Sequence, residues 1–191
     1  MTTMKDFQEA GTKLKFLARV GLRQALSSLP ERIQIFALNH CVLSGGCFVS
    51  LLHEQKVNDW DLWCIDAAKI PIMEELLASY TKEEADEIPV ENPAYMEQFV
   101  DGKIITVNAI TLKNKVQFIK MTDFTEAKKS FDFEHCRISY YPGSEVMYMS
   151  QTQFECIRDK QLIPTRPLNE YKDNVMRRLN KFTQRGWKYE V

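Results

Sequence analysis

Two aspartates one residue apart, Asp59 and Asp61, are the residues whose spacing most clearly indicates chemistry. Residues 59–65 alternate between polar and apolar, which predicts a strand with both carboxylates on one face, about 6 to 7 Å apart. Two carboxylates that close repel each other unless a cation lies between them. A magnesium or manganese ion fits this pattern, because hard divalent ions bind carboxylate and phosphate oxygens together.

A turn of small residues, Ser44-Gly45-Gly46, lies upstream of this pair. It follows an apolar run at residues 41–43 and precedes residues 47–54, which have helical spacing, so we expect the order strand, turn, helix. Glycines let the backbone approach a phosphate closely, and the first amides of a helix have no partner within it. A phosphate-binding turn beside a metal-binding strand is the arrangement that nucleotidyl transfer requires.

Together the two segments resemble a known signature. Leu43-Ser44-Gly45-Gly46 followed by Asp59-Trp60-Asp61-Leu62 resembles the hydrophobic-Gly-Gly/Ser and Asp-hydrophobic-Asp-hydrophobic motifs of the polymerase-beta-like nucleotidyltransferase superfamily. Residues 116–119, 131–136 and 178–186 further resemble segments of small nucleotidyltransferase-like proteins carried by bacteriophages and other viruses. The resemblance extends from about residue 40 to residue 187.

The resemblance implies a metal-dependent transferase that moves a nucleoside monophosphate from a nucleoside triphosphate to a hydroxyl acceptor. By this resemblance, the turn formed by Ser44, Gly45 and Gly46 binds the nucleotide. Asp59, Asp61 and a third carboxylate would be the catalytic residues and would hold Mg²⁺ or Mn²⁺. The acceptor stays open, with RNA, protein and a small molecule as the alternatives.

We expect the third carboxylate to be Asp132. It is a charged residue between two phenylalanines in the otherwise apolar segment 131–141, and such a position indicates a function. Asp101 and Glu134 are the alternatives. Asp101, however, is followed by Gly102 and is more typical of a turn. Glu134 shares the face of Asp132 by alternation.

Two further features are candidates for the nucleotide site. One is the aromatic side chain of Trp63, and the other is the basic face of the final predicted helix. Trp63 shares the face of the two aspartates, so its ring could stack on a base or simply pack. The basic face could bind a triphosphate or an RNA backbone, or be a solvated surface. The nucleotide-binding candidates beyond the turn are therefore Trp63, Arg178, Lys181 and Arg185. His135, by alternation, faces the core.

The 191 residues are 45% hydrophobic and have a formal net charge of −1. This composition supports a sizeable core and argues against a protein that coats nucleic acid through bulk charge. Five cysteines lack zinc-ligand spacing, as expected of reduced thiols in a cytoplasmic protein. Neither a signal peptide nor a membrane span is predicted, so we expect a cytoplasmic protein (in the host, if phage-encoded) with no membrane partner.

These residues must be positioned by an α+β fold, with a central mixed sheet flanked by helices, which the resemblance implies is nucleotidyltransferase-like. We expect a single domain, with a helical segment at 1–39, a catalytic sheet core at 40–141 and C-terminal helices at 150–191. The spacing predicts helices over residues 3–29, 31–39, 47–54, 71–80, 122–130, 150–159 and 169–184. Strands are expected at 41–43, 59–65, 103–112, 115–121 and 131–141, and loops at 81–92 and 162–168.

A function of a different class is also open. After Gly46 the chain reads Cys47-Phe48, where RNA-tailing and CCA-adding members of the superfamily typically have an arginine-aspartate pair. This departure argues against a tRNA-type acceptor. It also favours a catalytically inactive protein that uses the fold to sequester a nucleotide or to block a host enzyme.

Overall fold

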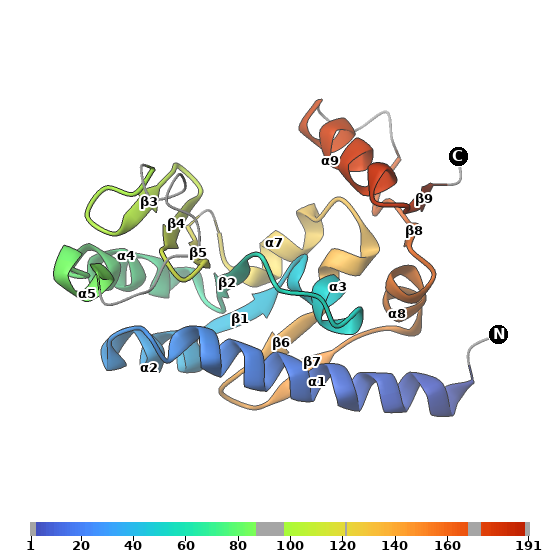
Figure 1. The fold of residues 1–191 in the computed structure, drawn as a ribbon, viewed down its shortest axis with the longest axis horizontal. Helices are drawn as coiled ribbons and strands as arrows, with labels where there is room; N and C mark the ends of the chain where they lie inside the picture. Colours follow the sequence, from blue (N-terminus) through green and yellow to red (C-terminus); the bar gives the residue numbers. More distant parts are fainter. Residues whose placement is uncertain (1–2, 87–97, 121, 168–172, 190–191) are drawn as a thin grey trace.

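The computed structural model describes residues 3–86, 98–120, 122–167 and 173–189 (Figure 1). Within these ranges, a seven-stranded sheet has the order β3-β4-β5-β2-β1-β6-β7. Strands β2 and β5 are parallel, and the other neighbouring pairs in this sheet are antiparallel. The strands are β1 (Cys41–Ser44), β2 (Trp60–Cys64), β3 (Lys103–Ile105), β4 (Ala109–Leu112), β5 (Val116–Ile119), β6 (Ser139–Tyr141) and β7 (Val146–Tyr148). A separate parallel pair joins β8 (Gln161–Leu162) to β9 (Lys188–Tyr189).

Helices flank this sheet, as the sequence predicts. They are α1 (Met4–Leu26), α2 (Glu31–His40), α3 (Cys47–Leu52), α4 (Ile70–Ala78), α5 (Lys82–Asp86), α7 (Phe124–Ser130), α8 (Gln151–Arg158) and α9 (Asp173–Gln184). Short 3-10 turns, η1 (Ala67–Lys69) and η2 (Glu134–Arg137), complete the described elements. In Figure 1, α1 runs along one side of the molecule and α9 lies on the opposite side of the sheet.

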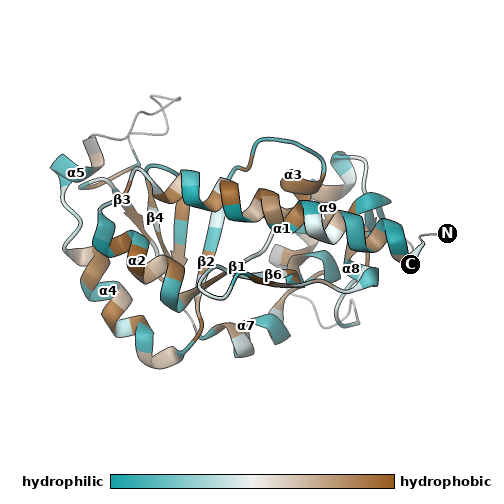
Figure 2. Ribbon diagram, turned by 90° about the horizontal axis from the view of Figure 1, so that it is seen from below, coloured by the Kyte–Doolittle hydropathy of each residue, from teal (hydrophilic) through white to brown (hydrophobic). Residues whose placement is uncertain are grey.

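The longest helix, α1, shows why these elements form. Its buried residues are four apart, at Leu14, Ala18, Leu22 and Leu26, so they form one stripe that packs on the core. A capping box at Thr3 satisfies the first free amides of this helix. Figure 2 shows hydrophobic residues along the strands and on one side of α1, whereas α9 is largely hydrophilic.

The predicted strand at residues 131–141 is wrong in its first half. The chain makes the 3-10 turn η2 there, and only Ser139–Tyr141 form a strand, β6. The reason is that the aromatic side chains of this segment pack against partners on different elements. The ring of Phe131 lies 5.4 Å from that of Trp63, whereas Phe133 packs against Phe182 of α9, with their centroids 5.8 Å apart.

Other differences are smaller. The expected strand 103–112 is a hairpin of two strands, β3 and β4, and strand β7 was not predicted. Residues 82–86 of the expected loop are helical, while 87–92 of that loop, Met121, Leu168 and residues 169–172 of the last helix lie outside the described residues. In the part of the chain that the structure describes, no helix combines the length and the apolar composition needed to cross a bilayer.

Candidate active site

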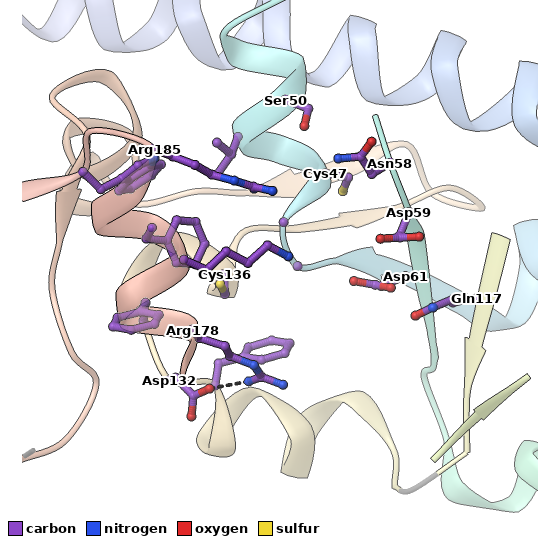
Figure 3. Close-up of a pocket in the computed structure, with 18 of the residues that line it drawn as sticks. Cys47, Ser50, Asn58, Asp59, Asp61, Gln117, Asp132, Cys136, Arg178 and Arg185 are labelled. Atoms are coloured by element: carbon purple, nitrogen blue, oxygen red, sulfur yellow. Dashed lines mark hydrogen bonds and ion pairs between the residues drawn. The ribbon is translucent and has the colours of Figure 1, made fainter. Parts of the chain in front are cut away.

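The two aspartates of the sequence motif lie on one wall of a pocket of about 810 Å³ (Figure 3). Strand β2 directs Trp60, Leu62 and Cys64 into the core, so its alternate side chains face the pocket. Asp61 is on that face, and Asp59 directly precedes the strand at an exposed position. The predicted placement of both carboxylates on one side is therefore confirmed.

The glycine turn is in close contact with one of these carboxylates. Gly45 has a φ of +111°, and a Cβ at this position would lie 2.7 Å from Oδ2 of Asp61. A side chain at residue 45 would thus occupy the space of the carboxylate. Gly46 has a φ of −71° and open space around it. Only the first glycine is required by the local geometry.

Ser44 is brought next to this turn but not into the pocket. Its side chain is fully buried, and its hydroxyl lies 2.7 Å from the carbonyl oxygen of Ile138 and 3.1 Å from that of Cys136. The hydroxyl donates within this buried region, which fixes β1 to the segment that leads into β6. In this structure Ser44 supports the turn from behind.

Asp61 has an unusual electrostatic environment. Burial, and secondly the charge of Asp59, raise the pKa of Asp61 to about 7, while Arg178 opposes this shift. Asp61 is therefore protonated in a large fraction of molecules at neutral pH unless a cation stabilises its charge. Two carboxylates facing one pocket, with one of them held against a glycine, fit a divalent cation as ligands.

Asp132 lines the same pocket but does not join this pair. It is 6% exposed and makes ion pairs with Arg178 and, at 3.7 Å, with Nη2 of Arg166. Figure 3 shows it across the pocket from the two aspartates. Among the described residues, no three His, Cys, Asp or Glu side chains are grouped closely enough to hold a metal ion. The expected convergence of three carboxylates is thus absent from the described chain, because residues 131–133 do not form a strand beside β2.

The wall opposite the aspartates is basic. The side chains of Arg178, Lys181 and Arg185 follow the helical repeat of α9 and all line the pocket. Val175 and Leu179 on the other face of α9 are buried, which fixes this orientation. Lys56 and Lys160 also line the pocket, so five cationic side chains of the described residues line it.

The remaining sequence candidates have structural surroundings of their own. Trp63 lines the pocket, but its ring packs edge-on against Phe131, with ring centroids 5.4 Å apart and an angle of 87° between the planes. Glu134 pairs with Arg137 at 2.9 Å. Asp101 has a φ of +48° in a turn, as the sequence suggests.

Several residues that line the pocket, among them Lys56, Lys160 and Gln117, are not among the candidates identified from the sequence. Gln117 of β5 lies directly opposite Asp61 of β2 in the parallel pair. In β5, Gln117 faces away from its buried apolar neighbours, Val116 and Phe118, and the alternation of residues 116–118 is a sequence signal for this. Which residue of another strand it would meet depends on the register, for which the sequence has no local signal.

Two solved structures are similar to this chain in fold. A tRNA-processing enzyme in an apo form has a TM-score of 0.52 and 16% identity, covering 85% of this chain and 45% of that chain. A Thermotoga maritima CCA-adding enzyme complexed with tRNA has a TM-score of 0.51 and 11% identity, covering 87% and 41%. This chain therefore has the mixed α+β fold of the nucleotidyltransferases, and it spans less than half the length of either enzyme.

The sequence match is more specific. The model of the Gabija anti-defense 2 family matches residues 17–160, and the chain belongs to this family. No curated protein matches the sequence significantly.

Proposed function

We propose that this protein is a metal-dependent nucleotidyltransferase that transfers a nucleoside monophosphate from a nucleoside triphosphate to a hydroxyl. One observation carries this proposal: a single pocket has Asp59 and Asp61 on one wall and Arg178, Lys181 and Arg185 on the other. A triphosphate with a divalent cation has complementary charges for both walls. The pocket volume of about 810 Å³ is within the range of small-molecule sites.

In this proposal Asp59 and Asp61 hold Mg²⁺ or Mn²⁺, which supplies charge stabilisation at the phosphate oxygens when bound. The basic residues of α9 neutralise the triphosphate and the pyrophosphate that leaves. The acceptor oxygen forms a bond to the α-phosphorus while the bond to the pyrophosphate oxygen breaks. The acceptor proton passes to whichever of the two aspartates lies nearer the hydroxyl.

The chain belongs to the Gabija anti-defense 2 family, and we propose that the transfer serves to counter Gabija. RNA and protein are the acceptor classes to be distinguished. One related structure is a CCA-adding enzyme complexed with tRNA, but its identity to this chain is only 11%. The sequence Cys47-Phe48 after the glycines also departs from that branch.

The test is transfer of label from each α-labelled nucleoside triphosphate, with Mg²⁺ or Mn²⁺, to total cellular RNA and total cellular protein. We expect transfer from at least one triphosphate to one acceptor class, and its loss in the double variant Asp59→Ala with Asp61→Ala. Absence of transfer to any acceptor, or transfer that survives in the double variant, would contradict the proposal.

A second candidate is an inactive protein that sequesters a nucleotide or blocks a host enzyme. It is favoured by Asp132, which is neutralised by Arg178 and Arg166, so that two carboxylates are left together among the described residues. This alternative predicts tight binding of a nucleotide or a protein without dependence on a divalent ion, and no transfer of label.

A further inference from the structure

Gln117 is positioned as a partner of Asp61 by the register of two parallel strands. Asp61 of β2 is paired with Gln117 of β5, and the flanking pairs are Trp60 with Val116 and Leu62 with Phe118. The residues of both flanking pairs are buried in the core. Paired residues of neighbouring parallel strands point to the same face, so the side chains of Asp61 and Gln117 both face the pocket.

The side chain of Gln117 is available to a ligand. It is half-buried and lines the pocket, and Figure 3 shows its amide beside the carboxylate of Asp61. No residue in the described ranges makes a hydrogen bond with this amide. Neighbouring strands are about 4.8 Å apart, so the amide oxygen of Gln117 can reach a cation held by Asp61.

The charge at this position matters because Gln117 has the shape of a glutamate without its charge. Among the described residues, the pocket has one further carboxylate, Asp132, which forms ion pairs with Arg178 and Arg166 on the other side. The two remaining carboxylates have a combined charge that balances one divalent ion. A second ion would lie among neutral groups or near the cations of α9, and bound ions need anionic partners.

We propose that Gln117 is a neutral ligand that limits the nucleotide-free site to one divalent ion per chain. The inference rests on the proposed function, because it concerns the same metal-dependent site. A carboxylate at residue 117 would supply the missing charge and admit a second ion beside the first. An apolar side chain there would leave the first ion with one ligand fewer.

The test uses Mn²⁺ alone as the probe, with the full chain and calorimetry or electron paramagnetic resonance to count bound ions. We expect one Mn²⁺ per wild-type chain and two in Gln117→Asp and Gln117→Glu. We expect one ion, bound about tenfold more weakly, in Gln117→Leu. Asn108→Asp is the matched control, because it adds a carboxylate to another position in the same pocket and should leave the count at one.

Two strong sites in the wild-type chain would overturn the inference, as would carboxylate and leucine variants that fold normally by circular dichroism and bind Mn²⁺ like the wild type. Both results would leave the proposed function standing, because ions would still bind. No bound Mn²⁺ in any variant would overturn the inference and the proposed metal dependence together.

Discussion

The backbone of Gly45 lies so close to the carboxylate of Asp61 that a Cβ on Gly45 would be 2.7 Å from Oδ2 of Asp61. The backbone at Gly45 has a φ of +111°, which other residues rarely adopt. The conformation of the turn and the position of the carboxylate therefore depend on each other. Changes at either residue should affect the position of the other.

Gly45→Ala should displace the Asp61 carboxylate and strain the turn. We expect loss of divalent-ion binding and a decrease of roughly 1–3 kcal/mol in the free energy of unfolding. Gly46→Ala is the control, because its φ is −71° and no atom lies within 4 Å of an added Cβ. Mn²⁺ titration and urea denaturation of both variants check this, and equal effects of the two substitutions would refute it.

Asp61 should make the metal-free protein less stable as pH rises. Its folded pKa of about 7 is above the usual value of 3.8, so the folded state binds the extra proton between these values. The unfolding free energy therefore falls with rising pH in this window, by up to about 1.4 kcal/mol per pH unit, and the loss is complete above pH 7. Asp61→Asn should remove this dependence and be more stable than the wild type at pH 8.

Urea denaturation in chelator at pH 5 and pH 8 measures this difference. The stability advantage of Asp61→Asn must be larger at pH 8 than at pH 5, and an advantage that does not grow contradicts the assignment. The same shift predicts that Mn²⁺ binding by the wild type releases a proton near neutral pH and tightens as pH rises from 6 to 8.

His135 should make the protein less stable as pH falls, which is the opposite of the effect of Asp61. Burial lowers its pKa from 6.5 to about 3, and neither ring nitrogen has a hydrogen-bond partner among the described residues. The unfolded state therefore binds a proton that the folded state excludes, so stability is lost as pH falls from about 6.5 toward 3. His135→Phe would fill the space among Phe133, Phe182 and Trp187 without this titration.

We expect His135→Phe to lose less stability than the wild type between pH 7 and pH 4, as measured by urea denaturation at a series of pH values. A wild-type profile in this variant would show that His135 does not titrate as its burial requires. Because Asp61 acts in the reverse direction over part of this range, the comparison is best made in the Asp61→Asn background.

The basic face of α9 should contribute to triphosphate binding. Lys181→Ala and Arg185→Ala each remove a cation that lines the pocket, and charged hydrogen bonds contribute about 1.5–3 kcal/mol. Each variant should therefore bind nucleoside triphosphate about tenfold or more weakly, with a smaller effect on Mn²⁺ alone. Arg177→Ala is the control, since Arg177 is exposed and does not line the pocket. An equal loss of triphosphate affinity in Arg177→Ala and Lys181→Ala would show that the net charge of the protein, and not the pocket, causes the effect.

Much of the fold was predictable because its signals are local. The repeat of Leu14, Ala18, Leu22 and Leu26 predicts α1, and the alternation around Asp59 and Asp61 predicts β2 and its two faces. Asp123 caps α7, since its side chain accepts a hydrogen bond from the amide of Glu126. The wall that holds the paired aspartates and the glycine turn beside it follow from these elements.

The rest depends on contacts between distant segments. Phe131, Phe133 and His135 alternate like a strand, but the rings of Phe133 and His135 stack in one cluster while Phe131 packs against Trp63, so the chain turns at η2. This turn places Asp132 across the pocket. The pairing of Gln117 with Asp61 is likewise set by strand register.

The most direct test of the central claim is calorimetric titration of each nucleoside triphosphate into the full chain, with Mg²⁺ and then with chelator. The account predicts that at least one triphosphate binds with Mg²⁺, that binding is lost or strongly weakened in chelator, and that Asp59→Asn with Asp61→Asn abolishes the effect of Mg²⁺. Binding that is equally tight in chelator and in the double variant would contradict a metal-dependent nucleotide site.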